Sequence, residues 1–208
     1  MTFLLLGISL LAALEGGEGP RFAGGRPPVL PPLAANGGLV GLELRIAPSG
    51  IVQDAIVIDD APPFTEELKK VVRLWRFQPR VENGARVEGR VALIGLFRGQ
   101  TLVGAGTPLP QRVARPSPQI PYPTATATPA YPPRALYSGV VMFEAEIDAQ
   151  GTVTDLKVLA AEEGFAATAA EAAGTFRFRP AQRDGNPISS RALLIFGFPQ
   201  PVTPLRPR

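Results

Sequence analysis

Residues 74–97 read LWRFQPRVENGARVEGRVALIGLF and residues 175–198 read TFRFRPAQRDGNPISSRALLIFGF, and the likeness of these two stretches decides the fold. They align without a gap at an offset of 101 residues. At the same offset the alignment extends toward the N-terminus, so that residues 28–97 match 129–198 with 21 of 70 positions identical. Because the identities fall on turn and core residue types, the chain is a tandem duplication of one unit.

Each copy begins with an alternating run of apolar residues, at 39–46 and at 140–147. A glycine-containing turn and a second β-rich run follow in both copies, which is the pattern of a β-hairpin. The alternation places Glu43 and Arg45 on the polar, outward side of the first run.

An amphipathic helix should follow from Thr65, because residues 68, 71, 72 and 75 form one apolar stripe. The second copy has three alanines and Phe176 at these positions, a thinner stripe, so we expect the second unit to be the less stable. After the helices, Pro79 and Pro180 block helix continuation. Turns at Asn83-Gly84 and Asp184-Gly185 then lead into a last strand.

The predicted fold class is therefore α+β. It consists of two tandem β-β-α-β units, each a three-stranded antiparallel sheet covered by one helix, joined by a proline-rich linker. A small sheet leaves its edges open, and an open edge is a template for another strand.

Composition excludes several classes of function. The 208 residues include 24 Pro and 22 Gly but no His and no Cys, which excludes Ser-His-Asp and Cys-His hydrolases, thiol redox chemistry and His-ligated zinc. Residues 37–98 carry nine Lys and Arg against eight Asp and Glu, and residues 138–199 carry five against eight. Neither unit has a basic excess that would suit nucleic acid. We therefore predict no enzyme activity, no cofactor, no metal and no nucleic-acid partner.

Several repeated residues have both a functional and a structural interpretation, and we favour the structural one in each case. Trp75 and Phe176 are expected in the core, with Arg76 and Arg177 as solvated charges beside them. Carboxylate pairs before the helices suit solvated loops better than glycosidase chemistry or a calcium site. The pairs are Asp59-Asp60 and Glu162-Glu163. Asp54 and Asp155 occupy equivalent positions in the two copies, and a hydrogen bond in a turn or at a strand edge explains them better than catalysis does.

The ends and linkers complete the predicted organisation. Residues 2–14 read TFLLLGISLLAAL, which is shorter than the roughly 20 apolar residues of a membrane-spanning helix and suits an export signal. A longer anchor or a buried N-terminal helix are the alternatives. The predicted domains are a signal peptide or short anchor (1–19), a linker (20–36), unit 1 (37–99), a proline-rich linker (100–130), unit 2 (131–199) and a basic tail (200–208).

The second unit resembles the C-terminal domain of the TonB family. The resemblance rests on Tyr131-Pro132, on Ile147-Asp148 with Gly151 and Val153, and on an aromatic-x-Phe-x-Pro pattern at residues 176–180 before the Asp184-Gly185 turn. The first unit matches less fully, with Leu30-Pro31 in place of Tyr-Pro. The resemblance covers roughly two thirds of the chain.

The resemblance implies a periplasmic protein, secreted or anchored at its N-terminus, that binds an extended segment of an outer-membrane TonB-dependent receptor or another envelope protein by strand addition. It also implies coupling to the proton-driven ExbB–ExbD motor, although the chain lacks the histidine of the family's anchor helix. The expected partner-binding residues lie on the last strand of each unit, as edge strands. They are Arg90, Val91, Ala92, Leu93 and Ile94, and Arg191, Ala192, Leu193, Leu194 and Ile195.

A second interpretation is a structural, self-associating module without energy transduction. In that case the edges of the two units pair with each other or with a second copy, which would make the protein a homodimer. The sequence leaves open whether both edges are free, since each unit can cap the other.

Overall fold

The computed structural model describes residues 19–31, 37–99 and 111–200. The predicted signal peptide or anchor and the predicted basic tail lie almost wholly outside these residues. Within them, no helix is long and apolar enough to cross a membrane. The elements in chain order are β1 (Arg21–Gly24), β2 (Gly38–Ile46), β3 (Val52–Asp60), α1 (Phe64–Val72), β4 (Arg76–Gln78), β5 (Arg80–Glu82), β6 (Ala85–Val87), β7 (Gly89–Phe97), β8 (Gln111–Arg112), β9 (Tyr122–Ala125), β10 (Gly139–Ile147), β11 (Val153–Ala161), α2 (Ala166–Gly174), β12 (Arg177–Arg179), β13 (Ala181–Arg183), β14 (Asn186–Ile188) and β15 (Ser190–Phe198).

The predicted β-β-α-β units are confirmed. Unit 1 contains β2, β3, α1 and β7, and unit 2 contains β10, β11, α2 and β15, with a small hairpin between helix and last strand in each. Both last strands pair antiparallel with the first strand of their own unit. The glycine turns also form as expected, since Asn83 and Asp184 have φ values of 50° and 51° and each precedes a glycine of positive φ.

The two units share one sheet, because their last strands pair with each other. The seven strands lie in the order β11-β10-β15-β7-β2-β3-β8, and β15 runs parallel to β7 over six residue pairs from Ala192–Ala92 to Gly197–Phe97. We call β7–β15 the central pair. Each unit therefore caps the last strand of the other, which is the arrangement that the sequence left open.

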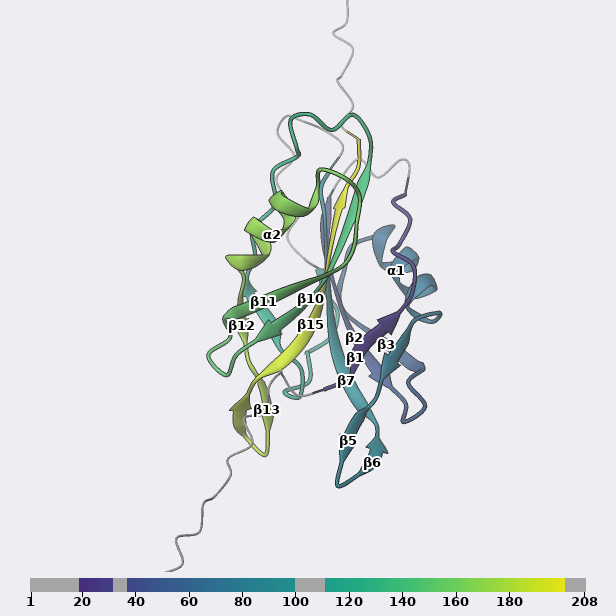
Figure 1. Cartoon of the computed structure of the whole chain (residues 1–208), viewed down its shortest axis with the longest axis vertical. Coiled ribbons are helices and arrows are strands. Elements are labelled where there is room, and N and C mark those ends of the chain that lie inside the picture. The colour runs from purple at the N-terminus through teal and green to yellow at the C-terminus, as the bar shows by residue number, and fades with distance from the viewer. Residues whose placement is uncertain (1–18, 32–36, 100–110, 201–208) are drawn as a thin grey trace, which may run out of the picture.

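The register of the central pair sets the positions of the helices. Paired residues differ by 100 in number, whereas equivalent residues of the two units differ by 101. Because side chains alternate between the faces of a sheet, this shift of one residue turns equivalent surfaces of the two units to opposite faces. Helix α1 accordingly lies on one side of the sheet and α2 on the other (Figure 1).

Each face of the sheet has a core built from both units. The α1 core combines Leu42, Leu68 and Trp75 of unit 1 with Leu193 and Ile195 of unit 2. The α2 core is its counterpart on the other face, and it joins the aromatic residues of unit 2 to unit 1 residues such as Ile94 and Leu96. Neither unit could be separated without exposing apolar residues of both cores to water.

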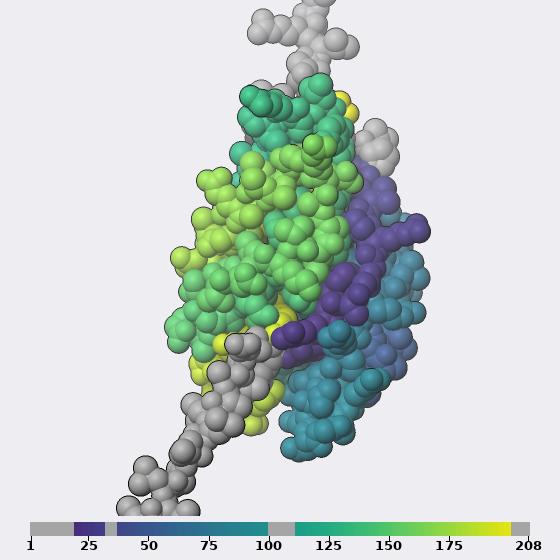
Figure 2. Space-filling view, in the orientation of Figure 1, coloured from purple at the N-terminus to yellow at the C-terminus, as the bar shows by residue number. Residues whose placement is uncertain are grey.

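Two segments that the sequence predicts to be linkers instead contribute strands. In the first, β1 pairs with β4, and in the second, β9 pairs with β12. We call residues 19–31 and 111–125 the first and second crossing segments, because each also contacts the other unit. Figure 2 shows the first of them, in purple, lying between unit 1 and unit 2 on one face of the molecule. Ile120 and Tyr122 of the second are buried.

Candidate partner-binding strands

The strands predicted to bind a partner, β7 and β15, lie at the centre of the sheet. Strand β7 pairs with β2 on one side and β15 on the other, and β15 lies between β7 and β10. The prediction that residues 90–94 and 191–195 form edge strands is therefore wrong, because each strand occupies the edge of the other. Whether these residues bind a partner is not tested by this pairing.

Strands β7 and β15 carry apolar side chains on both faces, which favours a central position in the sheet. Val91 and Leu93 pack into the α1 core, whereas Ala92 and Ile94 pack into the α2 core. All four are at most 2% exposed. Such two-sided burial is typical of central strands and gives a continuous apolar run in place of an alternating one. The runs VALIGLF and ALLIFGF carry this signal, which the sequence interpretation missed.

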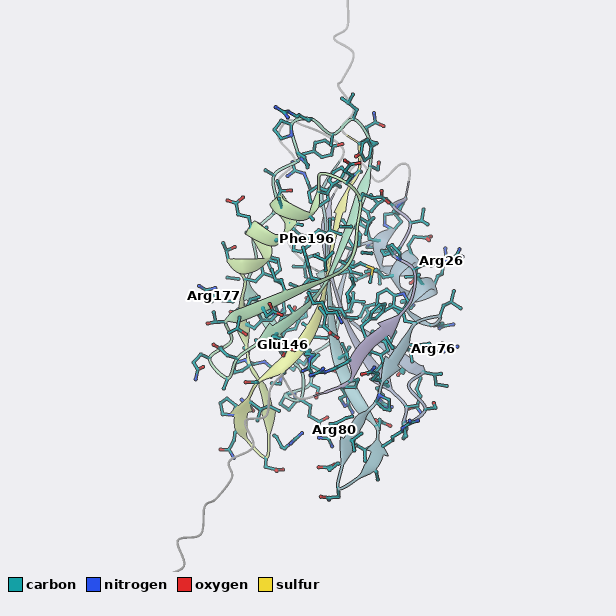
Figure 3. All side chains as sticks on the ribbon, viewed as in Figure 1. Arg26, Arg76, Arg80, Glu146, Arg177 and Phe196 are labelled. Carbon is teal, nitrogen blue, oxygen red and sulfur yellow. The ribbon has the colours of Figure 1, made fainter. Side chains whose placement is uncertain are left out.

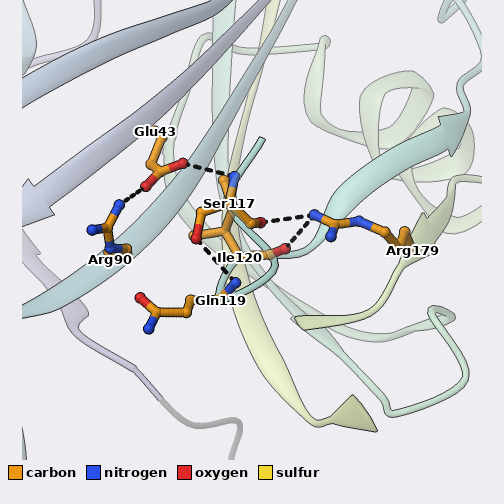
Figure 4. A network of polar contacts seen from close by, with 6 residues as sticks. All are labelled: Glu43, Arg90, Ser117, Gln119, Ile120 and Arg179. Atoms are coloured by element: carbon orange, nitrogen blue, oxygen red, sulfur yellow. Dashed lines mark hydrogen bonds and ion pairs between the residues drawn. The ribbon is translucent and has the colours of Figure 1, made fainter. Parts of the chain in front are cut away.

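A partly buried polar network lies beside the central pair on the α2 side (Figure 4). Glu43 of β2 accepts a hydrogen bond from Arg90 and another, of 3.1 Å, from the backbone N–H of Ser117. Arg179 donates to the backbone oxygens of Ser117, at 2.8 Å, and Ile120, at 3.1 Å. Burial lowers the pKa of Arg179, and the charge of Glu43 partly opposes that effect. The network holds the second crossing segment across unit 1.

The other face has a related contact. Glu144, the repeat equivalent of Glu43, accepts a 2.7 Å hydrogen bond from the backbone N–H of Phe22 in the first crossing segment. Nearby, Arg191 of β15 donates to Glu146 at 2.6 Å. Glu43 and Glu144 are 3% and 7% exposed, so the prediction that Glu43 lies on the outward side of its strand is wrong. In each unit a crossing segment that is distant in sequence covers the glutamate, which the alternating pattern alone would leave exposed to solvent.

The outer edge of unit 1 is partly covered by the chain itself. Strand β8 pairs with the end of β3, matching Arg112 to Asp59, and the backbone N–H of Val113 donates to Ile58 at 2.9 Å. Asp59 is fully buried and accepts hydrogen bonds from the Tyr122 hydroxyl and, at 3.2 Å, from Arg112. The sequence predicts a solvated loop carboxylate here, so that prediction is wrong for Asp59.

Tyr122 joins the second crossing segment to this edge. Its hydroxyl also accepts a 2.7 Å hydrogen bond from Arg112, whose guanidinium lies 4.7 Å from the centre of the Tyr122 ring. Burial raises the pKa of the Tyr122 phenol well above its ordinary value, and the hydrogen bond to Asp59 and the negative charge of Asp59 raise it further.

The outer edge of unit 2 is open. Strand β11 pairs with β10 on one side, and none of the described residues forms a strand on its other side. Asp155 and Lys157 are exposed, and Val158 is 53% exposed. Nine residues of edge backbone are therefore available here for pairing with another strand.

Asp60 is half-buried at the end of β3, opposite Gln111 of β8, and so is not a solvated loop residue either. The other predicted residues lie as expected. Trp75 and Phe176 are buried in the two cores, with exposed fractions of 0% and 1%. Arg76 and Arg177 are exposed and point away from opposite flanks of the molecule (Figure 3). Asp54, Glu162 and Glu163 are also exposed.

A polar groove of about 740 Å³ lies between the hairpins β5–β6 and β13–β14. Its lining includes Arg80, Glu88, Arg90 and Arg183. Arg80 pairs with Glu82 at 2.7 Å, and Arg90 pairs with Glu43, so these two cations are already neutralised. Among the described residues no cluster of acidic side chains is suited to holding a metal ion.

Comparison with known families finds a match for unit 2. Residues 127–198 match the family described as Gram-negative bacterial TonB protein C-terminal. This family is non-catalytic, acts in the periplasm and interacts in general with TonB-dependent outer-membrane receptors. The family model matches unit 2 only. Unit 1 is seen as another copy from the structure, where it repeats the order of strands and helix found in unit 2. No curated protein matches the chain.

Proposed function

From the match of unit 2 to the TonB C-terminal family, we propose that this protein is a non-catalytic periplasmic adaptor that binds an extended segment of an envelope partner by strand addition. The expected partner is an outer-membrane TonB-dependent receptor. We place the added strand on the outer edge of unit 2, along β11. Main-chain hydrogen bonds would provide the affinity, and side chains beside the edge the specificity.

The observation that carries this proposal is the edge of β11 that faces away from β10, on which none of the described residues forms a strand. The equivalent edge of unit 1 supports the mechanism. There β8 lies antiparallel to the end of β3, and the backbone N–H groups of Val113 and Ala114 donate to the Ile58 oxygen at 2.9 and 3.3 Å. The fold therefore accepts an added strand at this edge without rearrangement of the central pair.

Binding at residues 90–94 or 191–195 would need an opened form of the protein. The partner would have to displace β7 from β15, which exposes residues of both cores such as Leu93 and Leu194. Fully burying one leucine side chain is worth about 1.5–3 kcal/mol, so opening the whole central pair is costly. Coupling to the ExbB–ExbD motor is a separate proposal that concerns the N-terminal residues.

A second candidate function is the structural or self-associating module without energy transduction. It is favoured by the central pair itself, in which the two units satisfy each other's last strands. A module of this kind would retain its fold and its envelope location but enrich no receptor. The two candidates therefore differ in whether binding depends on β11.

Disulfide locks test where the partner binds, since the chain has no cysteine of its own. Ala92 and Ala192 are paired across the central pair, so Ala92→Cys with Ala192→Cys would prevent opening when oxidised. The matched control, Ala145→Cys with Ala192→Cys, links β10 to β15 within unit 2 and leaves the central pair free to open. A bulky polymer attached to Val158→Cys blocks β11, and the same label on the exposed Leu74→Cys is its control.

Each full-length variant is used to capture partners from envelope extract of the source organism, with circular dichroism as the check on folding. We expect outer-membrane receptors to be captured by both oxidised locks and lost only with the label at residue 158. Loss on oxidation of the central lock alone, with recovery on reduction, would place binding on the last strands. Absence of any receptor in all samples would favour the structural module.

A further inference from the structure

We propose that β11 pairs with β11 of a second copy of this chain, in an antiparallel arrangement whose two-fold axis passes through Leu156. The inference is independent of the proposed receptor, because it uses only residues of this chain. It assigns to the open edge an occupant that would compete with any other strand added there.

The central part of β11 is regular and suited to pairing. Its register against β10 shifts near each end, and between these shifts Phe143 to Glu146 pair in order with Val158 to Asp155. Asp155 and Lys157 therefore share one face of the sheet, and Leu156 and Val158 share the other. Leu156 is packed against the α2 core.

The two charged residues make the edge complementary to itself. Asp155 and Lys157 are exposed, are two residues apart and form no ion pair within the described part of the chain. In antiparallel pairing centred on Leu156, Asp155 lies opposite Lys157 of the second copy, and by symmetry this pair occurs twice. Opposite charges placed directly across two strands are favourable, whereas like charges are not.

Other registers lose this match. Centring the pairing on Asp155 or on Lys157 places that residue opposite its own copy, which brings like charges together. The register through Leu156 also sets Val158 opposite Thr154, two β-branched side chains that pack well across strands. The half-exposed Val158 side chain would gain cover in that position.

Unit 1 cannot make the same contact. Strand β3 has Asp54 at the position of Asp155 but Ile56 at the position of Lys157, so it has no cation to pair with the aspartate. Its far end is also paired with β8. Self-pairing is therefore specific to unit 2, and it would give dimers and not longer chains of molecules. One strand pair is a small interface, so the dimer should be weak and dependent on concentration.

Charge reversal tests the proposed register in the full chain by sedimentation equilibrium at low salt. We expect Lys157→Asp alone and Asp155→Lys alone each to weaken dimerisation by about tenfold or more, because each places two like-charged pairs across the interface. The double variant Asp155→Lys with Lys157→Asp should restore the wild-type dissociation constant. The matched control Asp54→Lys, at the equivalent site of β3, should leave it unchanged.

Mixing supplies a second readout that does not depend on the stability of either variant alone. Lys157→Asp has two acidic residues on the edge and Asp155→Lys has two basic ones, so an equimolar mixture should form a heterodimer. Circular dichroism verifies that each variant is folded. A wild-type protein that stays monomeric at the highest concentration studied, or a dimer that both single reversals leave intact, would overturn the proposal.

Discussion

The two units solve the same packing problem in opposite ways. In unit 1 the helix supplies a large residue, Leu68, and the sheet beneath it supplies Gly95. In unit 2 the equivalent helix residue is Ala169 and the equivalent sheet residue is Phe196. Leu68 lies in the α1 core above Gly95, whereas Ala169 and Phe196 both lie in the α2 core. The larger residue therefore comes from the helix in unit 1 and from the strand in unit 2.

The aromatic residues next to these positions also pack differently in the two cores. A side chain added at Gly95 would meet Phe97 at 2.7 Å and Leu68 at 3.0 Å, so the glycine makes room for both. Phe97 lies flat against Phe64, at 4.3 Å between ring centres and 6° between planes. Their equivalents in unit 2, Phe198 and Phe165, are 4.9 Å apart and tilted by 49°. The alanine-rich stripe of α2 is therefore not by itself a measure of how well unit 2 is packed.

The first test gives unit 1 the residue sizes of unit 2, a small residue on the helix and a large one on the strand. Leu68→Ala should lower the free energy of unfolding by about 2–5 kcal/mol because it leaves a cavity. Gly95→Phe should lower it by about 1–3 kcal/mol or more through overpacking. The two together should cost at least about 1 kcal/mol less than the sum, since the new ring fills the space that the leucine left. Urea denaturation of the four proteins measures the coupling.

Ile147→Ala serves as the control for this coupling, because Ile147 belongs to the core on the other face. Combined with Gly95→Phe it should give an additive loss. Equal coupling energies in the two cycles would show that the size exchange between helix and sheet has no energetic basis.

The second comparison is between the repeated glutamates. Glu43→Ala should cost about 2–3 kcal/mol, because it removes the acceptor of both the Ser117 amide and the Arg90 guanidinium. Glu144→Ala should cost less, about 1–2 kcal/mol, through loss of the Phe22 contact. Glutamine at either site keeps an acceptor and should cost under about 1 kcal/mol. Denaturation gives the energies, and faster amide exchange at Ser117 or Phe22 locates the effect.

These comparisons also show what the sequence was able to predict. The repeat and its turn residues were sufficient for the β-β-α-β unit, and the apolar stripe correctly placed Trp75 in the core although α1 ends earlier, at Val72. Such features depend on contacts within one unit. They follow from periodicities of two and 3.6 residues that can be read directly from the chain.

The joining of the units depends on contacts that periodicity does not describe. Glu43 alternates with apolar residues and so looks like a surface residue, yet Ser117, which is 74 residues away, covers it. Whether the central pair forms with an offset of 100 or 101 residues decides which side each helix takes, and no local pattern fixes that choice. The apolar runs of β7 and β15 are typical of central strands, a signal that the edge-strand prediction overlooked, and they do not specify which strand each would pair with.

The third prediction concerns the outer edge of unit 1 at high pH, where Tyr122 donates a hydrogen bond to Asp59. The pKa of the Tyr122 phenol is raised in the folded protein above its ordinary value of about 10. Its contribution to stability is therefore fully present below pH 10 and is lost as the pH rises through the folded-state pKa. Tyr122→Phe should cost about 1–2 kcal/mol at neutral pH by removing a donor to Asp59, and should flatten the alkaline loss. Urea denaturation between neutral and alkaline pH measures both effects, and an unchanged slope in the variant would contradict the assignment.

The smallest expected effect is that of removing Arg112. It measures the ion pair with Asp59 separately from the hydrogen bond that Tyr122 donates to Asp59. The Arg112 side chain is 52% exposed, so its ion pair with Asp59 is screened by water and should be worth about 0.5–1 kcal/mol. Arg112→Ala should therefore cost less than Tyr122→Phe. The Val113 and Ala114 amides should remain protected from exchange, because they donate to the Ile58 backbone oxygen and not to a side chain. A cost larger than that of Tyr122→Phe would mean that buried Asp59 needs a cation, and that β8 is held on β3 by charge more than by its backbone.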